Sequence, residues 1–77
     1  MKDNHHITPD EAATRPASEW IARRWMYMRG ARVCRKLMRK AQRAALPGAV
    51  AYYQRHIEQN VTKAREANHA ARRHPDQ

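Results

Sequence analysis

The sequence predicts an all-α chain: a short N-terminal helix followed by an antiparallel hairpin of two long helices. Phe is absent and β-branched residues never cluster, so strands are disfavoured. Only two glycines and four prolines interrupt the 77 residues, and the strongest break, Pro47 and Gly48, separates two long helical stretches. A chain of this length is expected to form a single small helical domain, whose core supplies roughly 3 to 5 kcal/mol of net stability.

The first helix is expected over residues 9–14, after a flexible N-terminal tail at residues 1–7. Thr8 can cap the helix, and Pro9 suits the first helical position. Glu11 follows Thr8 by three residues, which is the spacing of a capping box. The local sequence therefore contains a complete start signal for a short helix.

The second helix is expected over residues 16–45. Pro16 disfavours a helical conformation at Arg15 and is itself accepted at the start of a helix. Gly30 costs about 1 kcal/mol relative to alanine inside a helix and marks a bend or a close helix crossing. An apolar seam with spacings of three and four residues runs along this helix. Its members are Met26, Gly30, Val33, Leu37, Ala41 and Ala44.

The third helix is expected over residues 49–73, before a flexible tail at residues 74–77. Its seam comprises Leu46, Val50, Tyr53, Ile57, Asn60 or Val61, Ala64, Ala67 or Asn68, and Ala71. A short turn between two helices that each carry a seam predicts an antiparallel hairpin. When the two helices are laid side by side from the turn outward, Gly30 falls near Ala64. Small residues on both helices would then allow a close approach.

Positive charge is concentrated in the second helix. The chain has 16 Lys and Arg against 7 Asp and Glu, a net charge of +9, and residues 16–46 hold nine of the bases with one acid, Glu19. Like charges three and four residues apart repel, so an anionic partner would relieve this helix. The candidate contact residues are Arg23, Arg24, Arg29, Arg32, Arg35, Lys36, Arg39, Lys40 and Arg43.

Aromatic residues are interleaved with these bases. The aromatic candidates for partner contacts are Trp20, Trp25, Tyr27 and Tyr52. Arg and aromatic side chains together suit the stacking of unpaired bases, and Trp with Arg is also typical of protein interface hot spots. The alternative is that both Trp residues close the open end of the hairpin against Ile7 and Ala12. Because consecutive helical positions cannot all face inward, Tyr27 or Met28 is expected to be exposed.

No pattern indicates catalysis, a metal or a cofactor, so we expect a non-enzymatic protein with neither. Paired carboxylates, a glycine-rich phosphate loop and a serine nucleophile motif are all missing from the sequence. The five His residues lack the spacing of a helical metal-ligand pair, and no His is placed to activate Cys34. The single cysteine suits a reducing compartment, and no apolar run is long enough to span a bilayer. A cytoplasmic protein is therefore expected.

Two functions from different classes fit these observations. The first is a small basic accessory protein that binds RNA or DNA mainly through phosphate contacts of its Arg-rich helix, with weak sequence preference because no base-reading motif is present. The alternative is a protein-binding adaptor or inhibitor that docks the basic and aromatic helix on an acidic surface of a larger complex, in the manner of a phage or plasmid regulator of a host machine. A homo-oligomeric helical bundle whose charge only confers solubility is a third interpretation.

Overall fold

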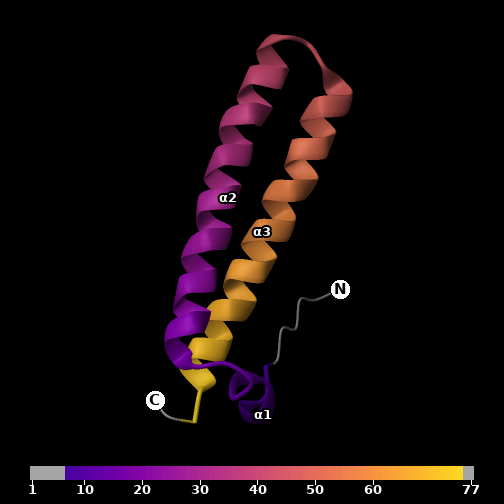
Figure 1. Cartoon of the computed structure of the whole chain (residues 1–77). Helices are drawn as coiled ribbons and strands as arrows, with labels where there is room; N and C mark the ends of the chain where they lie inside the picture. Colours follow the sequence, from indigo (N-terminus) through magenta and orange to yellow (C-terminus); the bar gives the residue numbers. More distant parts are fainter. Residues whose placement is uncertain (1–6, 76–77) are drawn as a thin grey trace.

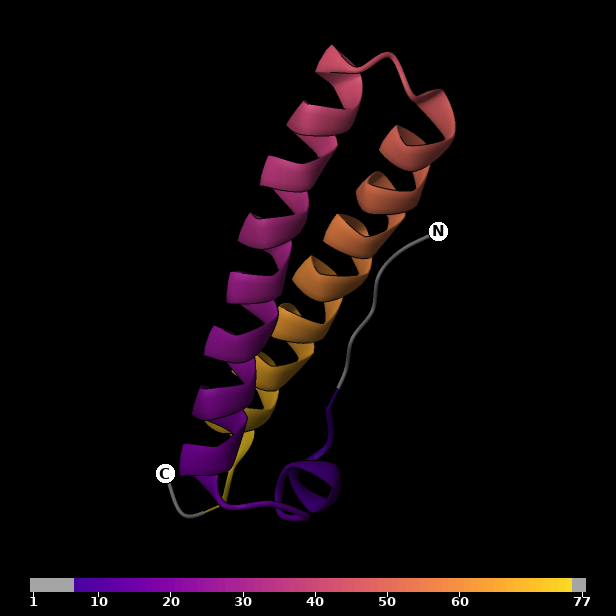
Figure 2. The same cartoon turned by 45° about the horizontal axis from the view of Figure 1, so that its top comes forward.

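The computed structural model describes residues 7–75 and confirms the all-α fold class (Figure 1). The helices, in chain order, are α1 (Pro9–Ala12), α2 (Ala17–Arg43) and α3 (Pro47–Arg73). The two long helices lie side by side as an antiparallel hairpin, and α1 lies at the open end of that hairpin, against α3 (Figures 1 and 2). The expected flexible tails fall mostly outside the described residues, at 1–6 and 76–77.

Helix α1 starts at the capping box that the sequence predicts. The backbone N–H of Glu11 donates to Thr8 Oγ1 at 3.2 Å, and the backbone N–H of Thr8 donates to Glu11 Oε1 at 2.9 Å. The helix ends at Ala12, two residues earlier than expected. Thr14 accounts for the early end, because its hydroxyl donates to the Glu11 carbonyl at 2.7 Å and so replaces a helical bond with a local turn.

The connection between α2 and α3 is displaced from the expected one. Helix α2 ends at Arg43 and α3 begins at Pro47, so the chain reverses over residues 44–46. Proline is accepted as the first residue of α3 because a helix leaves its first N–H groups without partners in any case. Gly48 therefore lies inside the first turn of α3, and it has no positive φ.

The reversal itself is a Schellman motif at the end of α2. The backbone N–H of Leu46 donates to the Ala41 carbonyl at 3.0 Å, and that of Ala45 donates to the Gln42 carbonyl at 3.1 Å. Ala45 adopts the left-handed conformation that this motif requires, with a φ of 55°. Glycine normally occupies this position, so the turn holds an alanine in a strained conformation.

The core of the hairpin is built from alanine. The buried apolar residues in the described part of the chain are Ala12, Ala31, Ala41, Ala64, Ala67, Ala70 and Ala71. No large side chain there is fully buried. Since hydrophobic stabilisation scales with the apolar area removed from water, this core contributes little per residue. The described chain measures 48 × 27 × 13 Å, a slab one helix thick.

Helix α3 packs through the predicted seam. Val50, Tyr53, Ile57, Asn60 and Val61 are half-buried, and Ala64, Ala67 and Ala71 are buried. Leu46, which was expected to begin this seam, is 53% exposed because it belongs to the turn. The remaining pattern was readable because α3 has a single apolar stripe.

The predicted seam of α2 is wrong for most of its members. Met26, Val33 and Leu37 are 54%, 50% and 37% exposed, and Ala44 is exposed as well. The helix is rotated by about one position, or 100°, from the expected orientation. The residues that face α3 instead are Trp20, Tyr27, Ala31, Cys34, Met38 and Ala41.

Gly30 does mark a close approach, but with a different partner from the one expected. A Cβ built on Gly30 would lie 3.0 Å from Asn60 Oδ1, so Gly30 faces Asn60 rather than Ala64. The absence of a side chain at position 30 provides room for the Asn60 amide. This contact fixes which edges of the two helices lie together.

Helix α1 and the end of α3 close the open end of the hairpin. The Trp20 indole Nε1 donates to the Ala12 carbonyl at 2.8 Å, and the Arg15 guanidinium lies 5.5 Å from the centre of the Trp20 ring. His74 is buried, with its Nε2 2.8 Å from the Arg15 carbonyl oxygen. The expectation that His74 belongs to a flexible tail is therefore wrong.

Candidate nucleic-acid interface

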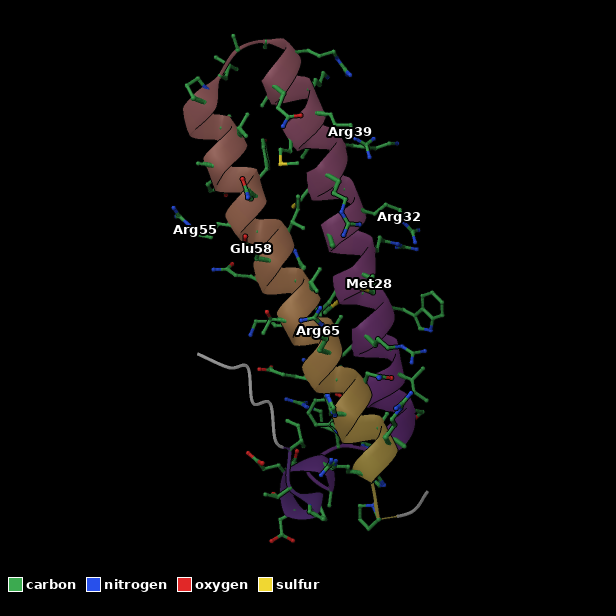
Figure 3. All side chains as sticks on the ribbon, turned by 180° about the vertical axis from the view of Figure 1, so that it is seen from behind. Met28, Arg32, Arg39, Arg55, Glu58 and Arg65 are labelled. Carbon is green, nitrogen blue, oxygen red and sulfur yellow. The ribbon has the colours of Figure 1, made fainter. Side chains whose placement is uncertain are left out.

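The outer face of α2 carries seven of the nine bases that the sequence singles out. All seven side chains are exposed: Arg29, Arg32, Arg35, Lys36, Arg39, Lys40 and Arg43. At 1.5 Å per residue they extend over about 21 Å of the helix. Arg32 and Arg39 extend away from α3 (Figure 3). We call these seven residues the basic face.

No acidic side chain of α2 neutralises the basic face. Glu19, the one acid in this helix, lies in its first turn. Its Oε2 is 3.2 Å from Arg15 Nη1 and 3.8 Å from Arg23 Nη2, so its charge is already shared by two other bases. Each of the seven exposed charges stands within about one turn of its nearest neighbour, close enough for their potentials to add at physiological salt.

The other two predicted bases are half-buried and engaged with neighbouring side chains. Arg24 Nη1 donates to Asn68 Oδ1 at 2.9 Å, which joins α2 to α3. Arg23 is half-buried beside Glu19, and its Nε is buried without a hydrogen-bond partner. Neither side chain extends freely from the basic face, so both differ in role from the seven others.

Trp25 is the aromatic residue that accompanies the basic face. Its side chain is 62% exposed, and the Arg24 guanidinium lies 5.5 Å from its ring centre. A surface hollow adjoins the ring, lined by Ala22, Trp25, Met26, Met28, Arg29 and Arg32. The exposed ring and the first bases of the face are therefore neighbours on one helix surface.

The remaining aromatic candidates lie elsewhere. One alternative was that both Trp residues close the open end of the hairpin. Trp20 does so, through its hydrogen bond to Ala12, whereas Trp25 is exposed. Tyr27 and Met28 are both half-buried, so the expectation that one of them is exposed is wrong. The rotation of α2 explains this, since it turns Trp25 and Met26 outward in their place.

Tyr52 belongs to a separate aromatic group on α3. It is 54% exposed, with its ring centre 5.3 Å from that of Tyr53 and 4.4 Å from that of His56. It lies near the turn, whereas Trp25 lies on the other helix toward the open end. The structure therefore does not bring Tyr52 and Trp25 into one aromatic site.

The described part of the chain holds neither a group of potential metal ligands nor a helix fit to cross a membrane. Among residues 7–75, no three His, Cys, Asp or Glu side chains come close enough together to hold a metal ion. Cys34 is a free, half-buried cysteine on the face of α2 that meets α3. No helix in this range combines the length and the apolarity that crossing a membrane requires.

Comparisons with known proteins add no relationship to these observations. The chain matches no protein-family model, and neither a curated protein nor a solved structure matches it significantly.

Proposed function

We propose that this chain is a small accessory protein that binds RNA or DNA through phosphate contacts of the basic face. The observation that carries the proposal is the row of seven exposed bases on one side of α2, with the acid of that helix engaged elsewhere. A nucleic-acid strand in duplex geometry presents one phosphate about every 3.4 Å, so a face of about 21 Å meets about six phosphates.

The chemistry of the face suits phosphate more than a diffuse negative charge. Five of its seven bases are arginines, and the planar guanidinium donates two parallel hydrogen bonds to phosphate oxygens. Trp25 adds an exposed ring on which an unpaired base can stack. Phosphate contacts and stacking carry little sequence information, so we expect weak sequence preference.

The proposed role is binding rather than catalysis, with neither a metal nor a cofactor. A cytoplasmic location is part of the proposal, because a lone thiol such as Cys34 stays reduced there.

The test compares two variants that remove the same charge from different helices. One changes Arg32, Lys36, Arg39 and Arg43 of the basic face to Gln. The matched control changes four exposed bases of α3 to Gln: Arg55, Lys63, Arg65 and Arg72. Fluorescence anisotropy with labelled 20-nucleotide RNA and DNA, single-stranded and duplex, measures the dissociation constants at fixed salt.

We expect the basic-face variant to lose at least about 100-fold in affinity, since four charge-assisted contacts are removed, and the α3 control to lose only a few-fold. Equal losses in both variants would mean that net charge alone attracts the oligonucleotide, and the proposed interface would be rejected. Circular dichroism of both variants checks that the helices remain folded.

A further inference from the structure

Helix α2 carries two apolar stripes, and the hairpin buries only one of them. The unused set, which we call the outer stripe, consists of Met26, Val33, Leu37 and Ala44, all exposed. Together with Gly30 and Lys40, these residues recur at alternating spacings of four and three, as the a and d positions of a paired helix do. Gly30, Leu37 and Ala44 take the a positions, and Met26, Val33 and Lys40 take the d positions. The pattern that suggested a seam in the sequence is therefore present, but its large members Met26, Val33 and Leu37 stay 37% to 54% exposed.

The outer stripe continues onto one edge of α3. Gly30, which shares the face of the outer stripe, lies against Asn60 of α3. Residues four apart lie on the same face of a helix, so His56 and Tyr52 follow Asn60 along this edge of α3 toward the turn. The rings of Tyr52 and His56 lie 4.4 Å apart. The stripe is thus bordered on the α3 side by aromatic surface.

The opposite border of the outer stripe is basic. Arg29, Lys36 and Arg43 each precede a stripe or seam position by one residue and recur every seven residues. In paired helices these are g positions, whose charges face the partner helix and decide which partner is accepted. A hollow beside Leu37 is lined by Lys36, Leu37, Arg39, Lys40 and Arg43, so apolar and basic groups line the same depression.

We infer that the outer stripe is the docking site of an acidic amphipathic helix supplied by a protein partner. Such a helix places its apolar residues on Met26, Val33 and Leu37 and its flanking carboxylates against the three g-position bases. Residues 26–44 span about 27 Å, which corresponds to about 18 residues of the partner helix.

Charge distinguishes this occupant from a second copy of the chain. A copy brings a net charge of +9, and an antiparallel pairing of two α2 helices sets the same g-position bases against each other. A parallel pairing would direct the g-position bases of one copy at the e positions of the other. Those positions are Tyr27, Cys34 and Ala41, which face α3 and offer the bases no opposite charge. Like charges facing across an interface oppose association, so the stripe favours an acidic partner.

The probe is a labelled 21-residue peptide of three heptads, with Leu at a and d and Glu at e and g. Mutual repulsion of its Glu residues keeps it monomeric at neutral pH. Two control peptides carry the same residues in shuffled order, or Lys in place of Glu. Anisotropy titrations with the full chain at 150 mM salt are expected to show binding of the ordered Glu peptide at least about tenfold tighter than either control.

Two variants test the location of the site. Val33→Ser with Leu37→Ser should weaken the ordered peptide about tenfold or more, because it removes the apolar centre of the stripe. Ile21→Ser is the matched control: Ile21 is 39% exposed, close to the 37% of Leu37, but lies about 160° around the helix from it. Replacing Arg29, Lys36 and Arg43 by Glu should reverse the preference toward the Lys peptide.

The inference is overturned if the shuffled peptide binds as tightly as the ordered one, or if the serine pair binds like wild type. It is equally overturned if sedimentation shows a wild-type dimer that the serine pair dissociates, since the occupant is then a second copy. Changing Arg35 to Gln separates the two proposals: it should weaken oligonucleotide binding and leave peptide binding within about twofold, because Arg35 is an exposed base that lies about 160° around the helix from both Val33 and Leu37.

Discussion

Asn60 occupies the space that a side chain at position 30 would need: a Cβ built on Gly30 lies 3.0 Å from Asn60 Oδ1 and 3.2 Å from its Cγ. The Asn60 amide is itself held in place, because its Nδ2 donates to the His56 carbonyl at 2.9 Å. The pair therefore lets α2 and α3 pass closely at this level and fixes the relative rotation of the two helices.

Gly30→Ala is expected to lower the free energy of unfolding by about 1 kcal/mol. Alanine gains about 1 kcal/mol in helix propensity, but the Asn60 amide must move, and losing a half-buried hydrogen bond costs about 1 to 3 kcal/mol. In an Asn60→Ala background the same change should instead stabilise, by up to about 1 kcal/mol. Urea unfolding of the four proteins measures this, and a loss of equal size in both backgrounds would contradict the role assigned to Asn60.

Ala45→Gly is expected to stabilise the chain by about 1 kcal/mol. Ala45 has a φ of 55°, and glycine adopts this conformation without the penalty of about 1 to 2 kcal/mol that a Cβ incurs there. Thermal or urea unfolding checks the sign. Ala44→Gly is the control, because Ala44 has a φ of −87° and should gain nothing.

Substitutions of Arg24 and Arg29 by Gln should separate an effect on folding stability from an effect on oligonucleotide binding. Arg24→Gln removes the hydrogen bond to Asn68 and is expected to cost about 1 kcal/mol of stability, since the group is only half-buried. Arg29 is exposed, so Arg29→Gln should leave the unfolding free energy within about 0.5 kcal/mol and weaken oligonucleotide binding. Unfolding and anisotropy data on both variants are required, and the reverse ranking would contradict the division of roles.

Salt should weaken oligonucleotide binding steeply. For about six phosphate contacts, the logarithm of the association constant should fall with the logarithm of salt concentration at a slope of about −4 for a single strand and −5 for a duplex. The variant with four Gln residues on the basic face should reduce the size of this slope by about 3. A slope that the variant leaves unchanged would place the phosphate contacts elsewhere on the molecule.

Trp25, and not Trp20, should report single-strand binding. A Trp20→Phe protein keeps only the exposed indole of Trp25, and its fluorescence should be quenched by a single-stranded oligonucleotide as a base stacks on the ring. Trp25→Ala should weaken single-strand binding roughly 5- to 150-fold, since stacking contributes about 1 to 3 kcal/mol per base. A Trp25→Phe protein, which retains Trp20 hydrogen-bonded to Ala12, serves as the fluorescence control and should show little quenching.

The helices were predictable from the sequence because side chains close in sequence determine where each helix begins and ends. The capping box at Thr8 and Glu11 forms as expected, and proline punctuation separates the long helices. The start of α3 was placed two residues late because Pro47 satisfies two rules, as a helix terminator and as a first helical residue. Tertiary packing and the Schellman bonds of the turn select the second role.

The orientation of α2 could not be predicted from spacing alone. Its two apolar stripes both recur every three and four residues, so periodicity does not distinguish the one that begins at Trp20 from the one that includes Val33. The stripe of Trp20 is used because the indole N–H finds an acceptor in Ala12, a contact made by a different helix. The bases of the basic face were identifiable from the sequence because an exposed charge needs no partner within the fold. The hydrogen bond of Arg24 to Asn68 was not, because it depends on how α2 is rotated against α3.

The alanine core has a thermodynamic consequence. Unfolding this chain exposes little apolar surface, so its heat-capacity change should be small and its stability should vary only weakly with temperature. The accompanying enthalpy is also small for so short a chain, which makes the thermal transition broad. Any ligand that binds only the folded hairpin then shifts that transition by several degrees per kcal/mol, so calorimetry can detect a partner of either proposed face without a label.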